Sequence, residues 1–110
     1  MAKFNADPPQ GLEYAHKGLI GALSPQANTT VEPEFNILWP VGYGMLTARL
    51  TSRKPAMNDR LFDYWDNMEQ TLNQFANAPL SAVAFACTGA SYLAGREEED
   101  ALVSLIANKR

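Results

Sequence analysis

The stretch Leu80-Ser-Ala-Val-Ala-Phe-Ala-Cys87 decides the fold, because it carries no charge and nearly all of its residues are apolar. Such a run is typical of a strand that is buried on both faces of a parallel sheet. Pro79 precedes the run, and the small residues of Thr88-Gly-Ala-Ser91 follow it. The stretch therefore predicts a central strand that ends in a turn.

Two further strands and three helices are predicted around this strand. Strands are expected at residues 17–24 and 42–51, and a helix at 31–39 with Thr29 or Thr30 as its N-cap. A second helix begins at Asn58 or Asp59, and a third covers 96–110 with the acidic run 97–100 in its first turn. The second helix carries apolar residues at intervals of three and four, namely Leu61, Tyr64, Trp65, Met68, Leu72 and Phe75.

The alternation βαβαβα predicts an α/β fold with three layers and a parallel, doubly wound, flavodoxin-like sheet. We expect residues 1–16 to form a flexible leader and residues 17–110 a single α/β domain. Ligands of such sheets bind at the carboxyl ends of the strands. The polar turns at 25–30 and 87–91 follow the first and third strands, so adjacency of these strands would make the turns face a common crevice.

Composition excludes several classes of partner. The 110 residues carry a formal charge of -3, and their Lys and Arg residues are scattered, which argues against binding to nucleic acid or to an anionic membrane. Residues 1–10 contain no apolar run, so neither a secretory signal nor a membrane span is expected, and we predict a cytoplasmic location. One cysteine and one histidine provide no metal site of ordinary ligand spacing.

Cys87 is the candidate for chemistry, since it ends a buried strand just before a turn of small residues. Backbone N–H groups in such a turn stabilise a thiolate, and Thr88 and Ser91 add hydroxyl donors for a carboxylate or an enolate oxygen. Asn28 lies in the other turn and offers a further donor. From the residues alone, a buried cysteine that acts as a small hydrophobe is the commoner case.

Four stretches in this order resemble the maleate cis-trans isomerases and arylmalonate decarboxylases of the aspartate/glutamate racemase superfamily, from Lys17 onward. They are Gly18-Leu-Ile-Gly21, Asn28-Thr-Thr-Val-Glu-Pro-Glu-Phe35, Pro40-Val-Gly42 with Ala48-Arg49-Leu50, and Ala86-Cys-Thr-Gly-Ala-Ser-Tyr92 with Gly95.

The resemblance implies a cofactor-independent isomerase, racemase or decarboxylase that acts on a small dicarboxylate. In that family Cys87 would be the first of two opposed cysteines, and it would act as a nucleophile or a proton-transfer group. Asn28 would bind a substrate carboxylate, and Thr88, Gly89 and Ser91 would line the anion pocket. The family uses neither metal nor organic cofactor, so no cofactor is expected.

The chain also departs from the family pattern. Gly89 stands where a serine is usual, Leu46 replaces a frequent histidine, and the second cysteine is absent. Because family members have two similar lobes, we expect this chain to be the N-terminal lobe of a longer enzyme, or to form a homodimer that places two Cys87 residues across one crevice.

Two questions stay open from the sequence. Arg49 either binds a substrate carboxylate or pairs with Glu32 or Asp63, and pairing within the protein is favoured. The competing function is a non-catalytic, flavodoxin-like module that binds an anion or a partner protein, and a third is a redox-sensing thiol. Thiol chemistry separates them, because a catalytic Cys87 is alkylated quickly and a buried structural one slowly.

Overall fold

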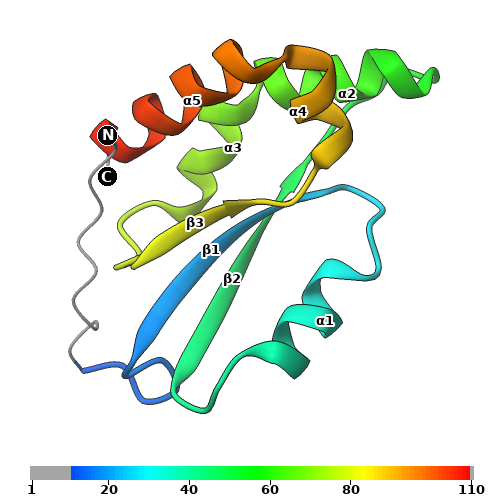
Figure 1. Cartoon of the computed structure of the whole chain (residues 1–110). Coiled ribbons are helices and arrows are strands. Elements are labelled where there is room, and N and C mark those ends of the chain that lie inside the picture. Colours follow the sequence, from blue (N-terminus) through cyan, green and yellow to red (C-terminus); the bar gives the residue numbers. More distant parts are fainter. Residues whose placement is uncertain (1–10, 110) are drawn as a thin grey trace.

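The computed structural model of the protein describes residues 11–109. Within this range the chain forms strands β1 (Gly18–Pro25), β2 (Tyr43–Leu50) and β3 (Ala82–Phe85). Helix α1 (Val31–Leu38) joins β1 to β2, whereas α2 (Met57–Asp66), α3 (Met68–Leu72) and the 3-10 helix η1 (Asn73–Phe75) join β2 to β3. Helices α4 (Thr88–Ala94) and α5 (Arg96–Lys109) follow β3. This alternation confirms the predicted α/β fold (Figure 1).

The sheet is parallel and its strand order is β2-β1-β3. β1 is therefore the central strand, and all its residues except Pro25 are buried. The prediction that the strand at 80–87 is central was wrong, because β3 covers only Ala82–Phe85, lies at an edge of the sheet and is half-buried along its length. An uncharged run indicates that both faces of a strand can be buried. It does not indicate whether other strands pair with one edge of that strand or with both.

Helices cover both faces of the sheet, which gives the three layers that the sequence predicted. Figure 1 shows α1 on one face and α2 to α5 on the other. The core lies between the sheet and the second group of helices, and Leu23, Leu50 and Met68 are its largest fully buried apolar side chains. On the opposite face Phe35 of α1, Trp39 and Tyr43 form a stack of rings, with centroids 5.1 and 6.4 Å apart.

The predicted helix with the apolar stripe is divided into three segments. It begins at Met57 with Ala56 as N-cap, not at Asn58 or Asp59, and it breaks at Asn67, where φ is -97° and ψ is 14°. The stripe itself packs into the core as predicted, with Tyr64, Met68, Leu72 and Phe75 all buried. Periodicity reports which face of a helix is buried, and a break of one residue leaves that pattern nearly unchanged.

Two other boundaries differ from the prediction. The stretch 88–91 forms the first turn of α4 and not a loop, because small residues followed by Tyr92 and Leu93 also suit a short helix. Residues 1–10 of the predicted leader lie outside the described residues. Ala15 is buried, and the N–H of Lys17 donates to the carbonyl of Gly42 over 2.8 Å, so the packed part of the chain begins before residue 17.

Candidate functional site

The carboxyl ends of the three strands define one edge of the sheet, and all the predicted site residues except Arg49 of β2 follow β1 or β3 there. β1 and β3 are neighbours, with Leu23 opposite Phe85, and the N–H of Ala86 donates to the Leu23 carbonyl over 2.8 Å. The two strands are therefore adjacent, which is the condition that the sequence analysis set for the turns to face a common crevice. Because parallel strands end at the same edge, the loop at 25–30 and the segment around Cys87 leave the sheet side by side.

The structure confirms Thr30, one of the two predicted residues, as the N-cap of helix α1, but the capping side chain belongs to Asn28. Thr30 occupies the N-cap position but makes no side-chain cap bond. Instead, the Asn28 Oδ1 atom accepts hydrogen bonds from the N–H groups of Thr30 and Val31, at 2.9 and 2.8 Å. The amide NH2 of Asn28 makes no hydrogen bond within the described part of the chain, so it keeps two donors for a ligand.

Arg49 holds the loop that carries Asn28. Its guanidinium forms an ion pair with Glu32, one of the two partners expected from the sequence. Its Nη1 atom donates to the carbonyl oxygens of Asn28 and Pro25, at 3.0 and 3.2 Å, and makes a longer contact of 3.4 Å with the Ser24 hydroxyl. Arg49 therefore ties β2 to the β1–α1 loop, and its binding to a substrate carboxylate stays a prediction.

Cys87 is the N-cap residue of α4 and is 7% exposed. It belongs to the core cluster, together with Leu50, Ala90 and Ile106. Its carbonyl accepts from the N–H of Ser91 over 3.4 Å, which begins the helix. The next residue, Thr88, is exposed at the carboxyl edge. The two predicted site residues therefore differ in access: the Cys87 side chain is nearly buried, and Thr88 is exposed.

Gly89 and Ser91 lie against the helices that neighbour α4. A Cβ atom at Gly89 would lie 3.3 Å from Leu61 Cδ1, so this glycine faces α2. Ser91 lines two hollows between α4 and α5, together with Glu99 of α5. Of the predicted pocket residues, Asn28, Cys87 and Thr88 follow the two adjacent strand ends, whereas Gly89 and Ser91 lie along α4 against its neighbouring helices.

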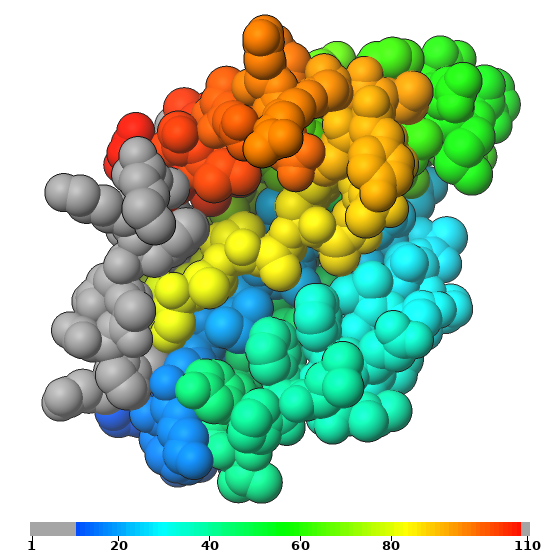
Figure 2. Space-filling model, viewed as in Figure 1, coloured from blue at the N-terminus to red at the C-terminus, as the bar shows by residue number. Residues whose placement is uncertain are grey.

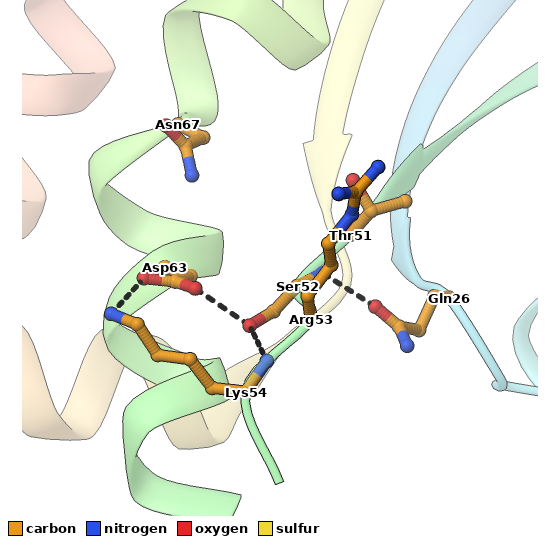
Figure 3. Close-up of a pocket in the computed structure, with 7 residues that line it drawn as sticks. All are labelled: Gln26, Thr51, Ser52, Arg53, Lys54, Asp63 and Asn67. Carbon is orange, nitrogen blue, oxygen red and sulfur yellow. Dashed lines mark hydrogen bonds and ion pairs between the residues drawn. The ribbon is translucent and has the colours of Figure 1, made fainter.

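A groove that the sequence analysis missed lies at the end of β2. It has a volume of about 670 Å³ and lies between the β1–α1 loop, the residues after β2 and helix α2 (Figure 3). The groove is lined by Gln26, Thr51, Ser52, Arg53, Lys54, Asp63 and Asn67. Figure 3 shows a chain of polar contacts across it: Lys54 Nζ and the Ser52 hydroxyl each donate to one oxygen of Asp63, both at 2.6 Å.

These contacts give Asp63 a structural role. The hydrogen bonds from Lys54 and from Ser52 hold the pKa of the Asp63 carboxyl below its usual value, whereas the hydrogen bond to Asp63 raises the pKa of Lys54. The trio of Lys54, Ser52 and Asp63 is held together by these two side-chain hydrogen bonds. It fastens the residues after β2 to helix α2. The polar run 51–54 at a strand end was the signal for this groove.

No group of three or more His, Cys, Asp or Glu residues in 11–109 is arranged to hold a metal ion. None of the helices in that range is both long and apolar enough to cross a membrane. Comparisons with protein-family models, with curated proteins and with solved structures return no match to this chain.

Proposed function

We propose that the chain carries a cysteine-dependent, cofactor-independent site for a small dicarboxylate at the carboxyl edge of β1 and β3. The observation that supports the proposal is the parallel pairing of β1 with β3, which are the strands that the Asn28 loop and Cys87 follow. The sequence resemblance to the aspartate/glutamate racemase superfamily concerns the same two segments. In this proposal Cys87 is the nucleophile, and Asn28 and Thr88 are donors to substrate carboxylates.

Isomerisation of a cis-unsaturated dicarboxylate is a reaction that one cysteine can complete. Addition of the Cys87 thiolate to one alkene carbon forms an S–C bond and moves the π electron pair onto the neighbouring carbon and its carboxylate. Rotation about the resulting C–C single bond follows, and expulsion of the thiolate then restores the double bond in the trans form. The reaction consumes no proton and no oxidant, and it needs no second cysteine. This fits the sequence, in which Cys87 is the only cysteine.

The hydrogen bonds of Asn28 fit the donor role. The side-chain oxygen Oδ1 of Asn28 accepts hydrogen bonds from two backbone N–H groups, which leaves the side-chain NH2 as the free end of the amide. The guanidinium of Arg49 donates a hydrogen bond to the backbone carbonyl of Asn28 and so positions the loop. In this proposal Arg49 acts on the substrate through Asn28, which differs from the direct contact with a substrate carboxylate that the sequence left open.

The burial of Cys87 favours a second candidate, a non-catalytic module that binds an anion through the same edge. A thiol that is 7% exposed and packed among Leu50, Ala90 and Ile106 resembles a core residue. In that case Asn28 and Thr88 would bind a carboxylate while Cys87 took no part in chemistry.

Conversion of maleate to fumarate by the purified chain tests the first candidate. We expect fumarate formation by the wild-type chain, followed by NMR, and its loss in Cys87→Ser. Asn28→Asp is the matched variant for binding: aspartate caps a helix as well as asparagine does, but it has no NH2 donors and adds a charge that repels the substrate. KM should rise at least tenfold while the free energy of unfolding stays unchanged.

The outcomes separate the candidates. Absence of fumarate, or full activity in Cys87→Ser, refutes the cysteine mechanism. Saturable binding of maleate without turnover, weakened by Asn28→Asp, supports the binding module instead.

A further inference from the structure

We propose that the groove at the end of β2 binds the phosphate group of a small, polar phosphate monoester. Its volume of about 670 Å³ lies within the roughly 300–1,000 Å³ of sites for small molecules. Figure 2 shows the β1–α1 loop, in light blue, and helix α2, in bright green, at the same end of the molecule. The groove lies between them at the carboxyl edge of the sheet, where ligands of such α/β folds bind.

Internal hydrogen bonds occupy the main acceptor atoms of the groove. Both carboxylate oxygens of Asp63 accept, one from Lys54 Nζ and one from the Ser52 hydroxyl, each over 2.6 Å. On the side of the β1–α1 loop, Gln26 Oε1 accepts from the N–H of Ser52 over 2.6 Å. The side-chain NH2 of Gln26 has no partner among the described residues and remains a donor. A ligand in the groove therefore meets mainly donors.

Arg53 is the charged group that the groove leaves unpaired. Its side chain takes part in no ion pair or hydrogen bond within residues 11–109. Lys54 is paired with Asp63, and the other acidic residues of α2, Asp59 and Asp66, do not line the groove. The lining residues thus keep one positive charge, in a chain whose formal charge is -3. A guanidinium binds an oxyanion through two parallel N–H···O bonds, so the groove is suited to an anion.

Two further donors lie around Arg53. Thr51 exposes its side chain after the end of β2, and Asn67 is the N-cap of α3 but makes no cap bond through its side chain. In Figure 3 the Asn67 amide and the Arg53 guanidinium lie on opposite sides of the groove, and the hydrogen bond between Ser52 and Asp63 lies below them. An anion above that bond is therefore contacted from two sides.

The number of donors favours a phosphate group over a carboxylate. A carboxylate has two oxygens, whereas a phosphate monoester has three terminal oxygens and a charge of about -1.5 to -2 at neutral pH. Arg53 binds two of the three oxygens, which leaves the third for Asn67 or Thr51. A phosphate group takes the space of only a few water molecules, each about 30 Å³, so the groove also has room for the organic part of the ester.

The inference goes beyond the proposed function and does not rest on it. Cys87, Asn28 and Thr88, the residues proposed to act on a dicarboxylate, do not line this groove. The polar character of all the lining residues indicates that the organic part of the ester carries hydroxyl groups rather than an apolar chain.

Titration of the whole chain with glycerol phosphate at low ionic strength, followed by NMR, tests the proposal. We expect saturable binding, with shift changes gathered at residues 51–54 and at the side-chain NH2 groups of Gln26 and Asn67. Arg53→Gln should weaken binding at least tenfold, because it removes a charge-assisted, bidentate contact. Arg96→Gln is the matched control: it removes the charge of another exposed arginine, at the start of α5 and outside the groove, and should leave the affinity unchanged.

A second variant tests the opposite side of the groove. Asn67→Asp keeps the shape of the side chain but replaces the NH2 donors by a charge that repels phosphate, so it should also weaken binding at least tenfold. Circular dichroism checks that each variant is folded, and Asn67→Asp decides the matter if Arg53→Gln is not. Inorganic phosphate and succinate are the comparison ligands, and both should bind more weakly than glycerol phosphate.

Four results would overturn the proposal. Glycerol phosphate could fail to bind saturably, or Arg53→Gln and Arg96→Gln could weaken its binding equally, which would make the effect one of overall charge. Succinate could bind as tightly, which would make the groove a carboxylate site, or inorganic phosphate could, which would exclude a role for the organic part. Turnover of maleate does not enter these measurements, so either proposal can fail while the other stands.

Discussion

Replacement of Arg49 by methionine measures how firmly the β1–α1 loop is held. Methionine keeps much of the apolar stem and removes the guanidinium, so the bonds to the carbonyls of Asn28 and Pro25 are lost together with the ion pair to Glu32. A hydrogen bond that involves a charged group contributes about 1.5–3 kcal/mol when it is buried. Because the Arg49 side chain is 37% exposed, we take about 1 kcal/mol for each loop bond.

The ion pair contributes less than these loop bonds. Both side chains are more than a third exposed, and pairs of this kind contribute about 0–1 kcal/mol. We therefore expect Arg49→Met to lower the free energy of unfolding by about 2–3 kcal/mol, and Glu32→Gln to lower it by less than about 1 kcal/mol.

Urea denaturation of the two single variants and of the double variant measures both contributions and their coupling. At about 4–8 °C per kcal/mol for a domain of this size, Arg49→Met should also lower Tm by roughly 10–20 °C. Equal losses for Arg49→Met and Glu32→Gln would refute the reasoning, because the ion pair would then account for the whole effect. A loss below about 0.5 kcal/mol for Arg49→Met would show that the loop bonds do not stabilise the fold.

Two further predictions concern packing and pH. In Gly21→Ala the new methyl group would lie 2.8 Å from Leu80 Cδ1 within the central strand, so we expect a loss of about 1–3 kcal/mol in thermal or urea unfolding. Gly89→Ala, with 3.3 Å to its nearest neighbour, is the control and should cost less; equal losses would contradict the packing argument. The pKa of Asp63 is lowered from 3.8, so its contribution to stability is present above pH 3.8 and is lost as the pH falls through its folded-state pKa. Unfolding of Asp63→Asn between pH 2 and 6 should therefore show a smaller loss of stability in acid than wild type, and an unchanged acid limb would exclude this contribution.

The segment from Met57 to Phe75 shows which features a local sequence pattern predicts and which it does not. The spacing of Tyr64, Met68 and Leu72 predicted correctly that one face of this segment is buried. The break at Asn67 was not predicted, because the apolar spacing continues across it. A kink of this kind depends on how the two halves of the segment pack on the sheet, and that information is not local.

The candidate site was predictable in its position but not in its contacts. The alternation of strands and helices placed the polar turns at the carboxyl edge, and the pairing of β1 with β3 brought them to the same side. The sequence did not show that Asn28 caps α1 with its side-chain oxygen, or that Ser91 faces α5. Such assignments depend on the direction of each side chain, which follows from the backbone around it.

The sequence by itself determined the α/β class, the parallel sheet and the segments that carry polar groups at strand ends. These properties depend on the alternation of apolar and polar residues along the chain, which is a local quantity. Only the tertiary structure decided that β1 is central, that β3 lies at an edge and that Arg49 holds the Asn28 loop. The physical reason is that strand order and side-chain partners arise between residues that are distant in the chain, where local pattern carries no information.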